Sequence, residues 1–176
     1  MDGYWRRPEE TAVTLADGWL HTGDIAEQAG EEIRIVDRKK AIIITSGGKN
    51  IAPSEIENAL KDSPFVREAI VVGEGQKFLG GLIQIDFDTV GRWAGERNLQ
   101  YTTYKSLTQL DEVRELIQGV IDEVNTRFAR VENIRRFVIL EKELDHDDGE
   151  LTATQKVRRG LIGKKFSREL EQIYGT

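Results

Sequence analysis

The sequence predicts an α+β fold, in which a small sheet of about three strands carries packed helices and follows a segment of strands and turns. Two observations identify the compact part. Residues 66–72 and 81–87 have the β-branched and alternating composition of strands, and residues 110–130 carry apolar side chains at helical spacing. A third observation sets the first part aside. Residues 1–36 contain turn dipeptides and no helical period, so they would bury little by themselves.

The remaining elements follow in chain order. Ser54 and Glu57 have the spacing of a capping box, which predicts a short helix after the Gly47-Gly48 turn. The Gly-containing link between the first two strands of the sheet predicts a hairpin. The other expected strands are 19–21, 32–36, 41–45 and 134–140, and the expected helices are 53–62, 88–97, 102–108 and 154–173.

Composition excludes several classes of protein. The chain has 176 residues, 25 Lys and Arg against 31 Asp and Glu, and a formal charge of −6. It has no Cys and only two His, so disulfides, Cys nucleophiles and a His-rich metal centre are excluded, and no metal-binding residue is predicted. Apolar runs are far shorter than the roughly 20 residues of a membrane helix, and the N-terminus has no apolar signal region. We therefore expect a cytoplasmic protein.

Charge is unevenly distributed along the second half of the chain. Residues 141–150 are strongly acidic, whereas residues 152–176 are mostly basic. We interpret the acidic run as a solvated turn and the basic run as a solvated helix face. Nucleic-acid binding through the basic run ranks last among the functions considered, because the whole chain is acidic and lacks a matching aromatic motif.

Four motifs occur in order: GWLHTGD at 18–24, VDRKK at 36–40, TSGGKNIAPSEIE at 45–57 and LTATQKVRR at 151–159. This series resembles the C-terminal part of the AMP-forming acyl-CoA synthetases, which belong to the adenylate-forming superfamily. The last motif and the insert around 98–110 are most similar to the long-chain fatty acid–CoA ligase branch. The resemblance implies two half-reactions, in which a carboxylate attacks the α-phosphate of Mg-ATP and CoA then displaces AMP from the acyl-adenylate.

The resemblance implies three residues on the nucleotide side. Asp24 is similar to the Asp that accepts hydrogen bonds from the ribose hydroxyls, and Arg38 to the Arg that contacts the ribose and phosphate. Lys156 is similar to the catalytic Lys that stabilises charge during adenylation. Each has a simpler interpretation from the residues alone, because Asp24 could satisfy a turn and the two cations could be solvated.

The resemblance also implies a moving domain and a CoA site. Asp37 corresponds to the hinge whose backbone torsions absorb a domain rotation. Gly47 and Gly48 correspond to the loop that lines the CoA pantetheine path, and Lys49 is a candidate for the CoA phosphates. From the residues alone, the two glycines fit an ordinary strand-to-helix turn equally well.

The domain organisation and partners follow from the same resemblance. Residues 1–36 are predicted to end a large adenylation domain, and residues 37–176 to form the mobile C-terminal domain. The phosphate loop and other motifs of the large domain do not occur in the chain. We therefore expect an inactive fragment whose ATP, Mg²⁺ and CoA are bound mainly by the large domain. Its partners would be that domain and a fatty acid, and peripheral membrane association of the full enzyme stays open.

Two alternatives remain open. The chain could come from another adenylate-forming enzyme with a different acyl substrate, since acyl specificity belongs to the large domain. It could also be a non-catalytic interaction module that kept the fold. The presence of Asp24, Arg38 and Lys156 at matching positions favours the enzyme.

Overall fold

The computed structural model describes residues 1–152 and 157–175, and the chain divides into two units. The first unit is Met1–Ile42 and the second is Ile43–Thr176. The division lies a few residues after the domain boundary predicted between residues 36 and 37. The assignment of these units to a large and a mobile domain stays a prediction.

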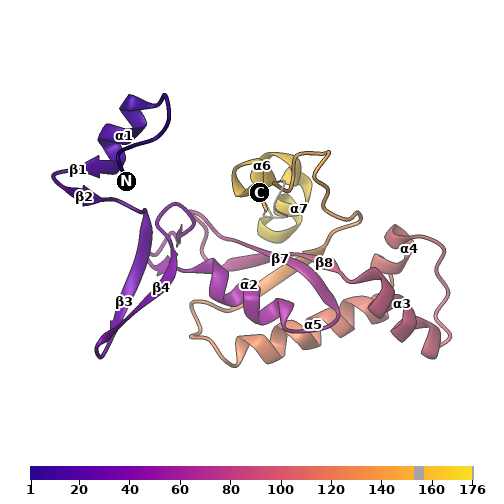
Figure 1. The fold of residues 1–176 in the computed structure, drawn as a ribbon. Coiled ribbons are helices and arrows are strands. Elements are labelled where there is room, and N and C mark those ends of the chain that lie inside the picture. Colours follow the sequence, from indigo (N-terminus) through magenta and orange to yellow (C-terminus); the bar gives the residue numbers. More distant parts are fainter. Residues whose placement is uncertain (153–156, 176) are drawn as a thin grey trace. The chain divides into compact units, whose positions relative to one another are not determined.

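The first unit consists of a short helix and two small hairpins (Figure 1). The predicted strands 19–21 and 32–36 correspond to β2 and β4. The helix α1 escaped prediction because it has no buried residue and therefore no apolar face to produce a helical period. Its first turn has Pro and two acidic residues, which favour a helix N-terminus. The elements are α1 (Pro8–Thr14), β1 (Leu15–Ala16), β2 (Trp19–Leu20), β3 (Asp24–Ala29) and β4 (Glu32–Arg38).

The second unit is built on the three-stranded sheet that the sequence predicts. Its strands β7 (Val66–Val72), β8 (Leu79–Ile85) and β9 (Ile134–Ile139) lie in the order β7-β8-β9. The predicted hairpin is confirmed, because β7 and β8 are antiparallel. Strand β9 is parallel to β8, so the helices between them form the crossover connection.

Helices cover both faces of this sheet (Figure 1). Ile83 of β8 belongs to one core cluster and Leu82 to the other, so neighbouring residues of the strand point into different cores. Every residue of β8 is buried as a result. One cluster includes residues of α2 (Pro53–Lys61), α3 (Phe87–Glu96), α4 (Tyr104–Thr108) and α5 (Asp111–Asn125), and the other includes residues of α6 (Arg159–Lys165) and α7 (Ser167–Tyr174).

Two predicted elements, the strand at 41–45 and the helix at 110–130, are shorter in the structure. The strand expected at 41–45 is only β5 (Ile43–Ile44), which pairs with β6 (Asn50–Ile51). Helix α5 ends at Asn125, whose side-chain amide exchanges two hydrogen bonds with the backbone of Ile134 and so joins the helix end to β9.

The helix predicted over 154–173 is wrong in its extent. Helix α6 begins at Arg159, and the predicted first residues 154–156 lie outside the described part of the chain. Phe166 then separates α6 from α7 with non-helical backbone torsions. Its side chain is buried in the same cluster as Ile162 of α6 and Ile173 of α7. The apolar spacing predicted a single helix with one apolar face. In the structure, α6 and α7 each contribute residues to the same apolar cluster.

Candidate functional site

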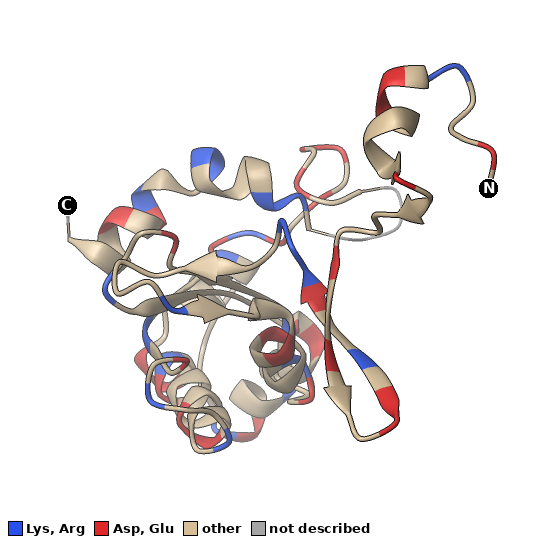
Figure 2. Ribbon diagram, turned by 90° about the vertical axis from the view of Figure 1, so that its left-hand side faces the viewer, with Lys and Arg blue, Asp and Glu red and all other residues tan. Residues whose placement is uncertain are grey.

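The β3–β4 hairpin brings together the two residues predicted on the nucleotide side. Asp24 and Arg38 are direct cross-strand partners. The Arg38 Nε atom lies 3.4 Å from Asp24 Oδ1 in an ion pair whose Arg side chain is 78% exposed and whose Asp side chain is 25% exposed. Charged residues of both signs line this hairpin (Figure 2). A carboxylate and a guanidinium are therefore offered together at the open end of the hairpin, where hydroxyl and phosphate oxygens could be bound.

The predicted hinge residue Asp37 is the last residue but one of β4. It is buried, at 7% exposure, and its Oδ1 accepts a 2.7 Å hydrogen bond from the backbone N–H of Arg38. Lys39, which follows Arg38, donates its backbone N–H to the Gly23 carbonyl at 2.7 Å. Asp37 thus lies at an element end and orients the residue that pairs with Asp24, but its part in a rotation stays a prediction.

The predicted CoA loop is the tight turn between β5 and β6. The Thr45 N–H donates to the Lys49 carbonyl at 3.1 Å, and the Gly48 N–H donates to the Thr45 carbonyl at 2.8 Å. Gly48 has φ +72°, which only glycine adopts easily, and a Cβ there would meet nothing within 4 Å. Gly47, Gly48 and Lys49 are all exposed. The loop therefore leaves its backbone open to close approach by a ligand.

The capping box predicted at the start of α2 is wrong. Ala52 is the N-cap and Pro53 is the first helical residue, so Ser54 lies inside the helix.

The carboxylate of Glu57 contacts strand β7 and helix α6 instead of capping its own helix. It accepts a 2.7 Å hydrogen bond from the backbone N–H of Val71 and forms an ion pair with Arg159. Burial raises the pKa of Glu57, although the nearby Arg159 acts in the opposite direction.

Lys156 lies outside the described residues, but residues on both sides of its segment are joined by backbone contacts. Leu151 and Val157 form an antiparallel β-bridge. Next to it, the Arg158 N–H donates to the Glu150 carbonyl at 2.8 Å. The two ends of the segment that contains Lys156 are therefore held side by side.

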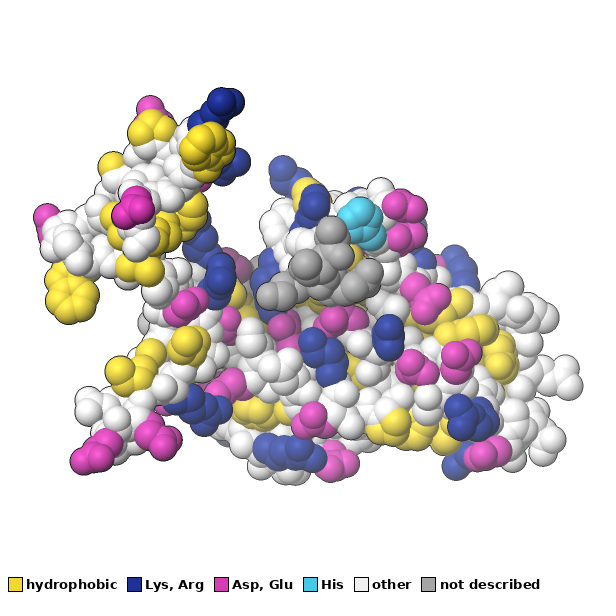
Figure 3. Space-filling model, in the orientation of Figure 1, with side chains coloured by type: hydrophobic (Ala, Val, Ile, Leu, Met, Phe, Trp, Pro, Cys, Tyr) yellow, Lys and Arg dark blue, Asp and Glu magenta, His cyan; other side chains and the backbone are white. Residues whose placement is uncertain are grey.

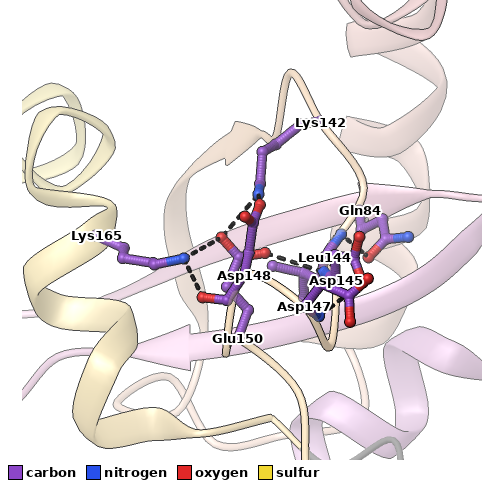
Figure 4. Close-up of polar contacts among 8 residues, drawn as sticks. All are labelled: Gln84, Lys142, Leu144, Asp145, Asp147, Asp148, Glu150 and Lys165. Atoms are coloured by element: carbon purple, nitrogen blue, oxygen red, sulfur yellow. Dashed lines mark hydrogen bonds and ion pairs between the residues drawn. The ribbon is translucent and has the colours of Figure 1, made fainter.

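The acidic and basic runs are less solvated than the sequence suggested. Glu150 is buried, at 1% exposure, and pairs with Lys142 and Lys165 (Figure 4). Burial lowers the pKa of Lys142, but its hydrogen bonds to Asp148 and Glu150 outweigh this effect and leave the pKa above its usual value. Sequence reasoning missed Glu150 because a run of acidic residues gives no sign of which member is buried.

Arg159 corrects the interpretation of the basic run in the same way. Its guanidinium is about one third exposed and donates to the Val71 carbonyl at 3.1 Å in addition to the ion pair with Glu57. Arg159 and Lys165 are thus structural partners of buried carboxylates, although about a third of each side chain remains exposed. Among residues 1–152 and 157–175, no group of three or more His, Asp or Glu side chains could hold a metal ion.

The helix-covered sheet of the second unit belongs to a known class of protein. The chain is a member of the AMP-binding enzyme C-terminal domain family, whose model matches residues 40–176. The family predicted from the four motifs is therefore confirmed.

Its relatives include long-chain fatty acid–CoA ligases. FadD15 of Mycobacterium tuberculosis is 38% identical over 99% of this chain, which covers 29% of that protein. The ligase ACSBG2 of Rattus norvegicus is 32% identical over 99% of this chain, again covering 29% of the relative. The chain thus spans less than a third of the length of the relatives that it matches.

Solved adenylation domains share the fold. The adenylation domain of a carboxylate reductase from Mycobacterium chelonae superimposes with a TM-score of 0.80 at 24% identity, covering 99% of this chain and 26% of that one. A didomain of the carboxylic acid reductase from Segniliparus rugosus, solved in complex with AMP, gives a TM-score of 0.72 at 26% identity. It covers 98% of this chain and 23% of that one.

Proposed function

We propose that the chain is the C-terminal portion of an ATP-dependent, AMP-forming long-chain fatty acid–CoA ligase. Membership of the AMP-binding enzyme C-terminal domain family and similarity to fatty acid–CoA ligases support this assignment. In the complete enzyme, the fatty acid carboxylate attacks the α-phosphate of ATP and releases pyrophosphate. The thiol of CoA then attacks the acyl carbonyl and displaces AMP.

The observation that carries the proposal is the pairing of Asp24 with Arg38 across the β3–β4 hairpin. Asp24 is to accept hydrogen bonds from the ribose hydroxyls of ATP, a role that suits a carboxylate with free lone pairs. Arg38 is to contact the ribose and phosphate side, where a planar, permanently charged guanidinium binds oxygens in a fixed geometry. The 3.4 Å ion pair keeps both groups at one place before the nucleotide arrives.

Lys156 is assigned to adenylation. Its ammonium would lie beside the carboxylate and α-phosphate oxygens and stabilise the negative charge that develops as the acyl-adenylate forms. No proton transfer is needed for this role. Mg²⁺, when bound with ATP, neutralises phosphate charge, and we assign its binding mainly to the large domain together with that of the adenine.

The Gly47-Gly48 turn is assigned to the thioester half-reaction. Its exposed backbone and positive φ at Gly48 fit a surface along which the pantetheine arm of CoA can pass closely. Lys49, exposed at the end of the turn, is the candidate partner of a CoA phosphate. Asp37 would supply the hinge that exchanges the two faces of the domain between the half-reactions.

The test uses the full-length protein that contains this chain. Incubation with ATP, Mg²⁺ and a long-chain fatty acid should release pyrophosphate, and addition of CoA should give acyl-CoA. Activity only with a short-chain or aromatic acid would replace the long-chain assignment by another acyl substrate. The absence of adenylate formation from every acid tried would favour a non-catalytic module. We further assign the enzyme to the cytoplasm, and sedimentation with vesicles would reveal peripheral membrane association.

A further inference from the structure

The described residues on either side of the segment that contains Lys156 are joined to each other, and we call this junction the base of the segment. Leu151 and Val157 form the β-bridge, and the Arg158 N–H donates to the carbonyl of Glu150 at 2.8 Å. This pairing fixes the positions of Leu151 and Val157 relative to each other, and so fixes both ends of the segment between them. What holds the base in place therefore bears on where Lys156 can reach.

The upstream end of the base is fastened by a buried carboxylate. The side chain of Glu150 is 2% exposed, and its Oε1 lies 2.9 Å from Lys142 Nζ and 3.4 Å from Lys165 Nζ. Its Oε2 accepts a 3.0 Å hydrogen bond from the backbone N–H of Asp145. Figure 4 shows the two lysines approaching from opposite sides, one from the loop itself and one from helix α6. Both oxygens of Glu150 are thus occupied, and the loop is tied to a helix.

The downstream end is fastened by a second buried carboxylate. Arg159, one residue after Arg158, donates to the Val71 carbonyl at 3.1 Å and pairs with Glu57. Glu57 also accepts the Val71 N–H at 2.7 Å. Helix α2, strand β7 and the start of helix α6 are therefore joined by one polar network directly beside the base.

Buried charge pairs of this kind add little to the free energy of unfolding, but they hold their groups in one arrangement. Burying a carboxylate costs desolvation energy, which an apolar residue of the same size would avoid. Directional hydrogen bonds, however, allow only one arrangement of the groups, whereas apolar packing tolerates several. Two such networks on either side of one short segment point to a requirement for precise placement.

We propose that Glu150 is a positioning residue for adenylation, because its pairs with Lys142 and Lys165 set the base from which Lys156 reaches the nucleotide. The Glu57–Arg159 pair sets the other end of the same base. This inference rests on the proposed function of Lys156. It concerns the placement of the segment and gives Glu150 no contact with the substrates.

The experiment replaces Glu150 by Gln in the full-length protein and measures each half-reaction separately. Gln keeps the shape of the side chain and removes its charge, and the partly exposed lysines can turn to water. Because a displacement of about 1 Å can cost 10²-fold in rate, we expect the kcat of adenylation to fall ~10–100-fold. The KM for ATP and the rate of thioester formation from supplied acyl-adenylate should remain close to those of the wild type.

Glu141→Gln is the matched control. Glu141 belongs to the same acidic run and pairs with Lys105, but its side chain is 51% exposed. This variant should keep both half-reactions at the wild-type rate. A folded Glu150→Gln variant with normal adenylation would overturn the proposal, and so would an equal loss in both half-reactions, which indicates general destabilisation. If Glu150→Gln does not fold, Lys165→Gln decides by the same criteria, since Glu150 then keeps Lys142.

Hydrogen exchange separates this inference from the proposed function. In the full-length Glu150→Gln variant, amides of residues 150–159 should exchange faster than in the wild type, while those of β7 and β8 stay unchanged. This result would support the role of Glu150 in holding the base, even if the wild-type protein forms no adenylate. In that case only the proposed function fails. Unchanged exchange across 150–159 would overturn the fastening whatever the activity.

Discussion

Lys156 is the residue on which the proposed chemistry depends most directly, and its replacement should separate the two half-reactions. In the full-length enzyme, Lys156→Ala removes a positive charge that acts only while the α-phosphate is attacked. We expect adenylation to slow ~10²–10³-fold, the usual cost of losing such a donor. Thioester formation from supplied acyl-adenylate should be nearly normal, because that step does not form negative charge at the same oxygens.

The control for this prediction is Lys164→Ala. Lys164 belongs to the same basic run and is exposed on helix α6. Its removal should leave both half-reactions unchanged. An equal loss of both half-reactions in Lys156→Ala would contradict the role assigned to Lys156. A similar loss in Lys164→Ala would point to the overall charge of the run as the cause.

At the scale of elements, the end of strand β4 is where a hinge can be tested. Pro fixes φ near −65° and removes the backbone N–H, so Asp37→Pro should hinder rotation about this residue. We expect one half-reaction to be impaired selectively, measured by pyrophosphate release and by acyl-CoA formation from acyl-adenylate. Asp37→Ala also loses the hydrogen bond to the Arg38 N–H but keeps free torsions, and it should affect both steps only mildly. Unchanged kinetics in Asp37→Pro would remove Asp37 from the hinge role.

Strand β8 and helix α7 approach each other so closely that Gly80 has no room for a side chain. A Cβ on Gly80 would lie 2.6 Å from Ile173 Cγ2 and 3.1 Å from the Tyr174 hydroxyl. Ile173 is buried and β-branched, so it cannot turn aside easily. Gly80→Ala should therefore lower the free energy of unfolding of the chain by about 1–3 kcal/mol, the usual cost of overpacking.

Gly119 in helix α5 supplies the opposite case. A Cβ there would meet nothing within 4 Å. Gly119→Ala should raise the free energy of unfolding by about 0.5–1 kcal/mol, since Ala is the better helix former. Urea denaturation of the two variants measures both effects. A Gly80→Ala variant as stable as the wild type would show that α7 does not pack against β8 as described.

At the scale of the whole molecule, the two units differ in how much apolar surface they bury. The core clusters all belong to the second unit, whereas the first unit exposes large apolar side chains (Figure 3). These include Trp5 at 85%, Val13 at 77%, Trp19 at 75% and Ile33 at 77% exposure. Such a surface fits the proposal that residues of the first unit pack against a large domain. In the described ranges, no helix has the length and apolar character needed to cross a membrane.

This difference predicts the behaviour of the isolated chain. The second unit has its own core and should fold, giving a cooperative thermal transition by circular dichroism. The chain should form no measurable acyl-adenylate or acyl-CoA, because the preassembled site that brings ATP and acid together is missing. Addition of the separately expressed large domain serves as the control. Acyl-adenylate made by the purified chain alone would contradict this prediction.

The spacing of apolar residues predicted the elements that turn an apolar face towards a core. Strands β7 and β9 and helices α2 and α3 fall within one or two residues of their predicted bounds, because their apolar spacing follows directly from burial. Helix α1 produced no signal since it buries nothing. Local pairing rules were less reliable, and Ser54 and Glu57 have the spacing of a capping box without forming one, since the helix begins earlier at Pro53.

The sequence by itself determined the family, the three strands of the sheet and the motifs that contain Asp24 and Arg38, because these depend on residue type and spacing along the chain. The pairing of Asp24 with Arg38 across the hairpin came from the structure. Only the tertiary structure decided which charges are buried. Glu57 and Glu150 resemble many other acidic residues in the sequence, yet Arg159 and Lys142 reach them from distant or folded-back segments. Burial and ion pairing are properties of position in space, so a one-dimensional charge pattern cannot distinguish a solvated carboxylate from a buried and paired one.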